Sequence, residues 1–193
     1  MFSKNSTADK TVTWPTAGSL IKKGKIGIIP TDTLYGLVAH INKPKAIKKI
    51  YEIKNRPKNK PLIVLIGSLE QLKRLPLATK KIDYEILNTY WPGPVSLILP
   101  TTKILKPISS NKTLAIRLPR SSKLRKWLCL YGPVVAPSAN PAGKEPARTL
   151  TETKKYFNQR VDFYVPAKKR LTKPPSALID LTVSQLQILR PFS

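Results

Sequence analysis

Short apolar runs separated by turn-forming residues recur along the chain and predict many short strands. Residues 25–30 read Lys-Ile-Gly-Ile-Ile-Pro, which is typical of a buried strand. The longest apolar run, at 61–66, also has the length of a strand and falls far short of the roughly 18 residues that span a membrane. The same criteria place strands at 25–30, 62–66, 95–99, 113–118, 133–136, 162–165, 177–181 and 186–190.

Helical spacing is clearest after Pro44, because proline is tolerated in the first turn of a helix. Ile47, Ile50, Tyr51 and Lys54 follow at the spacing that places side chains on one helical face. A turn-rich stretch is expected at 31–37. Further helices are expected at 15–23, 80–90, 121–130 and 150–157.

Strands and helices interleave over the whole chain, without an internal repeat or a low-complexity linker. This order predicts an α/β or α+β protein built around one twisted mixed sheet. We expect a single domain over residues 14–193, preceded by a polar, frayed tail at 1–13.

Composition narrows the class of protein. Of the 193 residues, 41% are hydrophobic, which is enough to bury a core. The N-terminus has no apolar segment like that of a signal peptide, and a single cysteine, Cys129, excludes an intrachain disulfide. We therefore expect a cytoplasmic protein, or one from a similar reducing compartment. Cys129 lies in an apolar helical run, which predicts a position in the core.

The chain is strongly basic. Thirty-five Lys and Arg residues face ten Asp and Glu residues, a formal net charge of +25. Such a surface attracts polyanions, including RNA, nucleoside triphosphates and anionic membranes. A basic proteome or a need for solubility would produce the same charge. Charge alone therefore does not separate an RNA-binding protein from an enzyme for phosphorylated substrates.

The arrangements of common hydrolases and nucleotide folds are missing from the sequence. A Ser-His-Asp triad would need His40, the only histidine, and no Gly-x-Ser-x-Gly elbow is present. His40 is better explained as a polar residue at a strand end. Neither Gly-x-x-x-x-Gly-Lys-Ser/Thr nor Gly-x-Gly-x-x-Gly occurs, and no paired carboxylates indicate a two-metal site. The remaining candidate chemistry is cationic and hydroxylic.

Two basic residues, Lys54 and Arg56, end the second predicted helix. Either is tolerated at a helix C-terminus as a solvated cap. Lys58 and Lys60 follow in a loop that precedes an apolar strand. Four cations in such a loop can converge on phosphates instead.

A loop of small residues follows the strand at 133–136. Around Ser138, Ala139 and Asn140, small side chains would let backbone amides and the Ser138 hydroxyl approach an anion closely. The same residues also suit an ordinary turn, and composition favours neither interpretation.

Arg117 shares one face of the strand at 113–118 with Thr113 and Ala115. An arginine on a central strand needs an anionic partner, because a buried unpaired charge is costly. That partner is either a structural carboxylate or, since the chain has only ten acids, a bound carboxylate or phosphate.

Taken together, these segments resemble the YrdC-like family of threonylcarbamoyl-adenylate synthases. Each motif is weak alone, but six in the same order are specific, and the resemblance covers about residues 14–190. The length is that of the short form of the family. The matching segments are PTDTLYGL at 30–37, KNRP at 54–57 with KPLI at 60–63, WPGP at 91–94, AIR at 115–117, PSAN at 137–140 with Gly143, and PSALID at 175–180.

The resemblance implies a single-domain α/β fold, a twisted and largely open mixed sheet flanked by helices, with a large basic concave site. It implies that L-threonine, bicarbonate and ATP give L-threonylcarbamoyl-AMP and pyrophosphate, for threonylcarbamoyl-adenosine modification of tRNA. Separate transfer proteins would receive the product. Mg²⁺ would be carried with ATP, because the shortage of carboxylates argues against dedicated protein ligands, and no membrane would be involved.

The resemblance also assigns roles to single residues. The catalytic residues would be Lys54 and Arg56. The ATP-binding residues would be Arg56, Lys60, Thr113, Ser138, Asn140 and Arg190. The threonine-binding residues would be Thr33, Arg117, Ala136 and Ser176, with Arg117 holding the carboxylate. Leu65 and Pro146 stand where many relatives have His and Ser, and neither change removes a charge from the phosphate site.

Two other functions compete with this one. A non-enzymatic double-stranded RNA or tRNA binder, or a ribosome-maturation protein, would explain the net charge and the eight basic residues between Lys43 and Lys60. No RNA-binding motif with exposed aromatic residues supports it. A carbamoyl-adenylate-forming module of hydrogenase maturation normally belongs to a much longer chain with zinc-finger cysteines, which are missing here.

Overall fold

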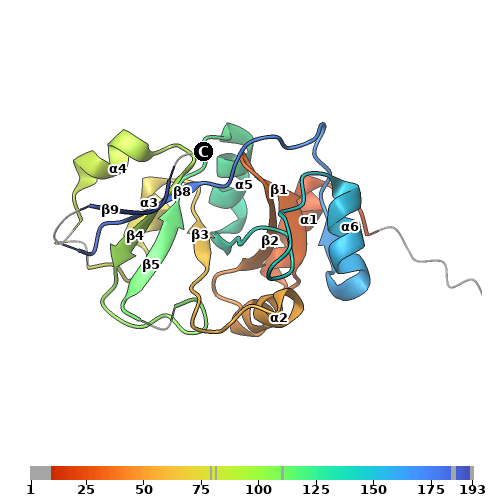
Figure 1. Cartoon of the computed structure of the whole chain (residues 1–193), viewed down its shortest axis with the longest axis horizontal. Coiled ribbons are helices and arrows are strands. Elements are labelled where there is room, and N and C mark those ends of the chain that lie inside the picture. Colours follow the sequence, from red (N-terminus) through yellow and green to blue (C-terminus); the bar gives the residue numbers. More distant parts are fainter. Residues whose placement is uncertain (1–9, 79, 81, 110, 184–185, 192–193) are drawn as a thin grey trace, which may run out of the picture.

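One mixed sheet of nine strands, with helices on both faces, forms the body of the protein in the computed structural model (Figure 1). The structure describes residues 10–78, 80, 82–109, 111–183 and 186–191. The strands are β1 (Gly27–Pro30), β2 (Tyr35–His40), β3 (Ile63–Leu65), β4 (Val95–Pro100), β5 (Thr113–Arg117), β6 (Val134–Val135), β7 (Phe163–Tyr164), β8 (Ala177–Asp180) and β9 (Gln187–Arg190).

The strand order is β7-β1-β2-β6-β3-β5-β4-β8-β9. The pairs β1–β7, β3–β5 and β4–β8 are parallel, and the others are antiparallel. The predicted α/β class and mixed sheet are therefore confirmed. The helices are α1 (Trp14–Lys22), α2 (Pro44–Lys54), α3 (Leu69–Lys73), α4 (Tyr84–Tyr90), α5 (Ser122–Tyr131) and α6 (Leu150–Phe157), followed by a short 3-10 turn, η2 (Asn158–Arg160).

Helices cover the two faces of the sheet with separate hydrophobic clusters. Val64 and Leu65 are neighbours on β3 but belong to different clusters, because successive side chains on a strand point to opposite faces. The Leu65 cluster contains residues of α1 and α5, including Ile21 and Leu128. The Val64 cluster contains residues of α2, α4 and α6, such as Ile50 on α2. Both faces of the central strands are thus buried.

Helix α2 forms as its sequence predicts. Pro44 opens the helix in its first turn, and the predicted inner face of Ile47, Ile50, Tyr51 and Lys54 is buried. The helix ends at Asn55, whose φ of 51° lies in the left-handed region that terminates helices. The last residue of α2, Lys54, lies on the buried face of the helix and therefore points into the interior of the protein.

Two elements depart from the predicted boundaries. The stretch expected to be turn-rich becomes strand from Tyr35 onward, because Tyr35–His40 pairs with β1 on one side and β6 on the other. The helix expected at 80–90 starts only at Tyr84, where the Asp83 side chain accepts hydrogen bonds from the amides of Glu85 and Ile86. Helix α3 was not predicted; the side chain of Ser68 caps it.

The predicted core position of Cys129 is wrong, since its side chain is exposed. Leu124, Trp127 and Leu128 form the buried face of α5, and Cys129 lies one residue beyond that face. His40 occupies the last position of β2, as expected.

The prediction of a frayed tail at 1–13 is also wrong for Thr11 and Val12, which pair with β7. Thr11 bridges Tyr164, and the Val12 amide donates to the Tyr164 carbonyl at 2.8 Å. The first nine residues of the tail lie outside the described residues. No helix among the described residues is long and apolar enough to cross a membrane.

Candidate functional site

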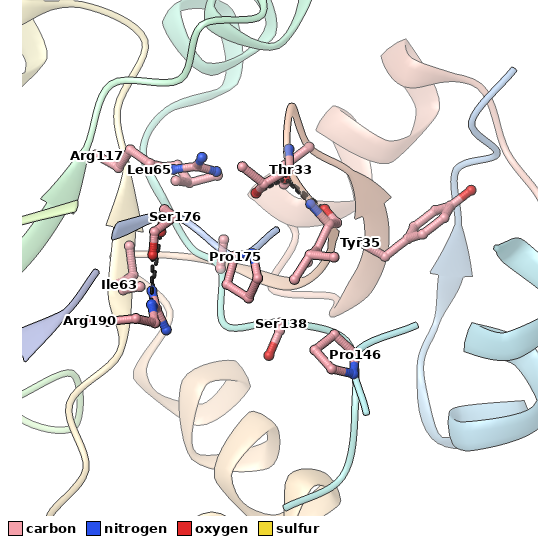
Figure 2. Close-up of a pocket in the computed structure, with 14 residues that line it drawn as sticks. Thr33, Tyr35, Ile63, Leu65, Arg117, Ser138, Pro146, Pro175, Ser176 and Arg190 are labelled. Atoms are coloured by element: carbon pink, nitrogen blue, oxygen red, sulfur yellow. Dashed lines mark hydrogen bonds between the residues drawn. The ribbon is translucent and has the colours of Figure 1, made fainter. Parts of the chain in front are cut away.

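A cavity of about 170 Å³ lies beside the central strands, and loops from distant parts of the sequence close around it (Figure 2). The structure brings six predicted site residues into its wall: Thr33, Arg117, Ala136, Ser138, Ser176 and Arg190. The other predicted residues, Lys54, Arg56, Lys60, Thr113 and Asn140, do not line it. Further lining residues are Thr31, Leu34, Tyr35, Gly36, Ile63, Leu65, Pro146 and Pro175.

The turn between β1 and β2 forms one wall. The Thr31 hydroxyl organises this turn, because it accepts hydrogen bonds from the amides of Thr33 and Leu34, both at 3.2 Å, and donates to the Leu34 carbonyl at 2.6 Å. Thr33 is buried and contributes to the cavity wall. The turn is thus held by its own side chains, and Thr33 has a fixed position.

Arg117 is the buried cation of the cavity. Its side chain is 4% exposed, and its Nη2 lies 3.2 Å from the Asp32 Oδ1. Among the described residues, its Nη1 and the Asp32 Oδ1 are buried atoms without a hydrogen-bond partner, so the two side chains are held together as an ion pair. Burial lowers the pKa of Arg117, while Asp32 raises it and the charge of Arg190 lowers it further. One face of the guanidinium is thus paired with a structural carboxylate, and one nitrogen stays available to an anion.

The opposite wall comes from the segment before β8 and from the edge strand β9. The Arg190 Nε donates to the Ser176 carbonyl at 2.6 Å, and its Nη2 lies 3.2 Å from the Ser176 hydroxyl. That hydroxyl also pairs with the Ser96 hydroxyl at 3.0 Å. Arg190 therefore fixes Ser176 and adds a second guanidinium to the cavity.

Apolar residues complete the cavity. Leu65 and Arg117 are register partners on the parallel strands β3 and β5, so their side chains lie side by side. Ile63 lies two residues earlier on the same face of β3. Pro146 also lines the cavity, so both residues that depart from the family pattern belong to the site. The cavity combines two guanidinium groups, those of Arg117 and Arg190, and several hydroxyl groups with an apolar wall.

Lys54 does not point into solvent as a helix cap would. It is 4% exposed, and its Nζ donates to the carbonyl oxygens of Ser138 and Asn140, both at 2.5 Å. The Asn140 Oδ1 lies 3.5 Å away. Burial, and secondarily the charge of Arg56, lowers the pKa of Lys54 to about 7. The solvated-cap interpretation is wrong for Lys54, which anchors the loop at 137–149.

That loop is held by hydrogen bonds within itself and to β2. The Ala139 amide donates to the Tyr35 carbonyl at 2.8 Å, and the Asn140 amide to the Ser138 carbonyl at 3.0 Å. The Ser138 hydroxyl donates to the Asn140 Oδ1 at 2.6 Å. The Ala139 and Asn140 amides are therefore committed within the protein and do not form the anion cradle that the small residues allowed. The Ser138 side chain still contributes to the cavity.

Arg56, Lys60 and Thr113 lie outside the cavity. Arg56 donates from Nε to the Lys60 carbonyl at 3.2 Å and from Nη2 to the Pro61 carbonyl at 2.9 Å. Burial lowers the pKa of Arg56. Lys60 is exposed, and the Thr113 hydroxyl donates to the Asn111 Oδ1 at 2.8 Å. Arg56 therefore shapes the loop that carries Lys60 as well as presenting its own charge.

Asp32 is the site residue that sequence reasoning missed. The resemblance assigned its neighbour Thr33 to threonine binding, while Asp32 itself received no role. The available signal was the rarity of acids, because one of only ten lies inside a motif that faces a buried arginine. Among the described residues, no group of three His, Cys, Asp or Glu side chains could hold a metal ion.

Comparison with known proteins identifies the family of the chain. The Sua5/YciO/YrdC family model, which carries the description telomere recombination, matches residues 19–191. The threonylcarbamoyl-AMP synthase of Hahella chejuensis is 36% identical over 173 residues, which cover 85% of this chain and 91% of that protein. The threonylcarbamoyl-AMP synthase of Pyrococcus abyssi is 32% identical over 178 residues, covering 91% of this chain.

The chain spans only 52% of the Pyrococcus abyssi synthase. A crystal structure of Pyrococcus abyssi Sua5 complexed with L-threonine superposes with a TM-score of 0.84 and 34% identity. The match covers 92% of this chain and 53% of that one. The family model and the relatives thus agree over nearly the whole chain, which belongs to the Sua5/YciO/YrdC family.

Proposed function

We propose that the protein is a threonylcarbamoyl-AMP synthase, a nucleotidyltransferase that forms L-threonylcarbamoyl-AMP and pyrophosphate from L-threonine, bicarbonate and ATP. The single observation that carries the proposal is the unpartnered, buried Nη1 of Arg117 in a small cavity with hydroxyl groups and an apolar wall. A guanidinium in such a cavity suits the carboxylate of an amino acid. The relatives with this name support the reaction.

The threonine subsite uses residues on two walls. Arg117 binds the carboxylate, while Thr33 and Ser176 offer hydroxyl groups to the amine and the side chain. Ala136 contributes its backbone beside them. The cavity of about 170 Å³ suits a ligand of the size of an amino acid.

The nucleotide occupies the adjoining surface, where Ser138 links the two subsites. Ser138 lines the cavity, and its carbonyl is bonded to Lys54 at the end of α2. Arg56, Lys60, Thr113, Asn140 and Arg190 complete the proposed ATP contacts. Mg²⁺ enters as part of the MgATP substrate, and its role is to neutralise charge on the triphosphate.

The reaction needs alignment more than covalent help from the protein. The threonine amine and bicarbonate give a carbamate with loss of water, and a carbamate oxygen attacks the α-phosphorus of ATP. The bond from the α-phosphorus to the bridging oxygen breaks, and pyrophosphate leaves with the electron pair. Arg56 and Lys60 stabilise the charge that develops on the phosphates. Lys54 holds the loop at 137–149, whose Ser138 and Asn140 align the nucleotide.

A cationic surface supports a role for RNA beside the adenylation site. Lys45, Lys48 and Lys49 are exposed on α2. We propose that the product serves tRNA modification through separate transfer proteins in the cytoplasm, and that this surface contacts tRNA or double-stranded RNA. Such binding falls steeply with salt concentration, because it rests on phosphate contacts. Binding of tRNA without any turnover of ATP would instead favour the non-enzymatic alternative.

One experiment tests the proposed function directly. The purified protein is incubated with MgATP, bicarbonate and threonine, and the adenylate and pyrophosphate are measured by mass spectrometry and a coupled assay. Parallel reactions omit threonine or replace it with serine. Formation of the adenylate only with threonine supports the proposal, whereas threonine-independent pyrophosphate release or no product refutes it.

A further inference from the structure

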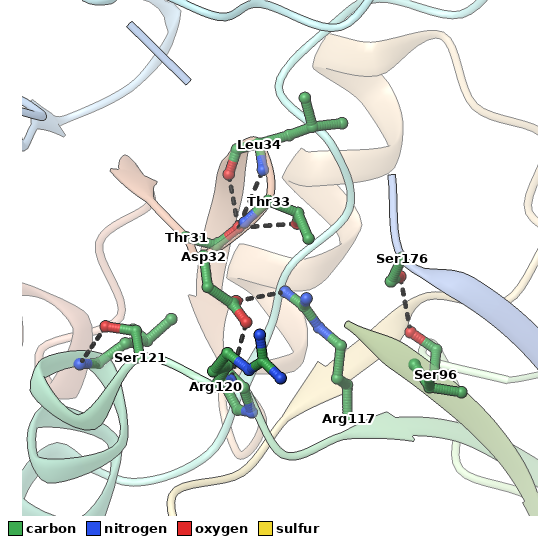
Figure 3. A network of polar contacts seen from close by, with 12 residues as sticks. Thr31, Asp32, Thr33, Leu34, Ser96, Arg117, Arg120, Ser121 and Ser176 are labelled. Atoms are coloured by element: carbon green, nitrogen blue, oxygen red, sulfur yellow. Dashed lines mark hydrogen bonds and ion pairs between the residues drawn. The ribbon is translucent and has the colours of Figure 1, made fainter. Parts of the chain in front are cut away.

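The carboxylate of Asp32 connects three segments that are distant in the sequence (Figure 3). Its Oδ1 forms an ion pair with the Arg117 Nη2 at the end of β5, 3.2 Å away, and accepts no hydrogen bond from the described residues. Its Oδ2 accepts a hydrogen bond of 2.8 Å from the backbone amide of Arg120, in the segment that leads into α5. Asp32 itself belongs to the turn that presents Thr33 to the cavity.

Both charges of this pair are removed from solvent. The side chains of Arg117 and Asp32 are 4% and 9% exposed. Arg190 is the other charged group that acts on Arg117, and its like charge lowers the pKa of Arg117. Without a carboxylate at position 32, two guanidiniums in one cavity would repel each other, and Arg117 would lose the group that sets its orientation.

We infer that Asp32 is a positioning residue for substrate binding: it holds Nη2 of Arg117, so that Nη1 is directed at the carboxylate of the amino-acid substrate. The inference rests on the proposed function for the identity of that substrate. Asp32 acts through Arg117 and makes no contact with substrate itself. The backbone amide of Arg120 keeps the carboxylate in place, because it occupies the second oxygen.

The variant Asp32→Asn tests this role with little change of shape. An asparagine has one acceptor oxygen and one NH₂ group, so it cannot satisfy both the Arg120 amide and Arg117. If its oxygen accepts from Arg120, its NH₂ group faces another donor, and Arg117 turns away. Glu70→Gln is the matched control, because it removes one carboxylate charge from an exposed ion pair with Lys73.

The experiment compares the binding of threonine with that of threoninol, which lacks the carboxylate, by calorimetry. The wild-type protein should prefer threonine by about 10- to 100-fold, the range expected for one charge-assisted contact. Asp32→Asn should weaken threonine binding by about tenfold and leave threoninol binding unchanged, so the preference for threonine falls by about tenfold. Glu70→Gln should keep the wild-type preference.

The outcomes separate this inference from the proposed function. An equal loss of affinity for both ligands, or an unchanged preference, overturns the positioning role of Asp32 while the wild-type enzyme stays active. A wild-type protein that forms no threonine adenylate refutes the function instead. If Asp32→Asn does not fold, Asp32→Glu must show the same selective loss for threonine, because it keeps the charge but moves the carboxylate by one methylene.

Discussion

Lys54 and Ser138 lie 84 residues apart in the sequence, and the Nζ of Lys54 donates a hydrogen bond to the carbonyl oxygen of Ser138. A second bond from the same Nζ reaches the Asn140 carbonyl. The lysine that a phosphate-binding motif would present to the triphosphate is thus already engaged with the protein. We therefore expect its contribution to the proposed reaction to be the placement of the loop that carries Ser138 and Asn140.

The variant Lys54→Met removes these hydrogen bonds but keeps the length of the side chain. Two partly buried carbonyl groups lose their donor, so we expect the free energy of unfolding to fall by about 1–3 kcal/mol and the KM for ATP to rise. Urea denaturation and steady-state kinetics measure the two effects. Lys49→Met, at an exposed position on α2, is the control for loss of charge. Equal behaviour of the two variants would contradict an anchoring role for Lys54.

The depressed pKa of Lys54 predicts a pH dependence of stability. In the folded protein the pKa is lowered from 10.5 to about 7. Between these values the unfolded chain binds more protons, so the contribution of Lys54 to stability rises with pH, by at most about 1.4 kcal/mol per pH unit.

This dependence is measured as the difference in the free energy of unfolding between the wild type and Lys54→Met. The free energy of unfolding of the wild type should increase more steeply with pH than that of Lys54→Met, over a window of about pH 7.5 to 9.5. Other groups titrate in both proteins and cancel in the difference. Parallel pH profiles would show that Lys54 has an ordinary pKa in the folded state.

The sequence predicted those features that depend on local pattern. The inner face of α2 follows from the spacing of Ile47, Ile50, Tyr51 and Lys54, and all four side chains are buried. Most strands follow from short apolar runs. Strand β2 was not among the predicted strands, because Tyr35 and Gly36 were assigned to a turn-rich stretch, and its strand conformation depends on pairing with β1 and β6.

The site required contacts between distant segments, which a pattern does not contain. The motifs brought Thr33, Arg117 and Ser176 together correctly, because the fold places all three on one cavity. They did not reveal that Lys54 is engaged with two backbone carbonyls. Nor did they reveal Asp32 as the partner of Arg117, since that ion pair joins a turn to the end of a strand 85 residues later.

Arg117→Lys should separate charge from geometry in the threonine subsite. Lysine keeps the positive charge beside Asp32 but lacks the planar fork that serves two partners at once. We expect the KM for threonine to rise by about 10- to 100-fold, with a smaller change in the KM for ATP. Kinetics at saturating ATP and varied threonine measure the effect. An unchanged threonine KM would refute the carboxylate contact.

Arg56→Ala should affect the nucleotide instead. Arg56 is half-buried and donates to the Lys60 and Pro61 carbonyls, so its loss loosens the loop as well as removing a charge. We expect the KM for ATP to rise by about 10- to 100-fold, with the threonine KM nearly constant. Lys58→Ala, at an exposed position in the same loop, should have little effect. An equal KM for ATP in Arg56→Ala and Lys58→Ala would refute the proposed contact of Arg56 with ATP.

Leu65 belongs both to the apolar wall of the cavity and to the core. Its replacement should therefore change both the stability of the protein and the binding of threonine. The side chain is 1% exposed, lines the cavity and packs in the cluster that contains Leu124 and Leu128. Leu65→Ala should therefore lower the free energy of unfolding by about 2–5 kcal/mol. Leu65→Met, which nearly conserves volume, should cost less than about 1.5 kcal/mol.

The same pair of variants tests the wall itself. Leu65 is the register partner of Arg117, so an enlarged cavity at this position leaves the guanidinium without its apolar neighbour. We expect Leu65→Ala to raise the threonine KM and Leu65→Met to leave it close to the wild-type value. If Leu65→Ala loses stability but binds threonine normally, Leu65 serves only the core, and the apolar wall takes no part in holding the substrate.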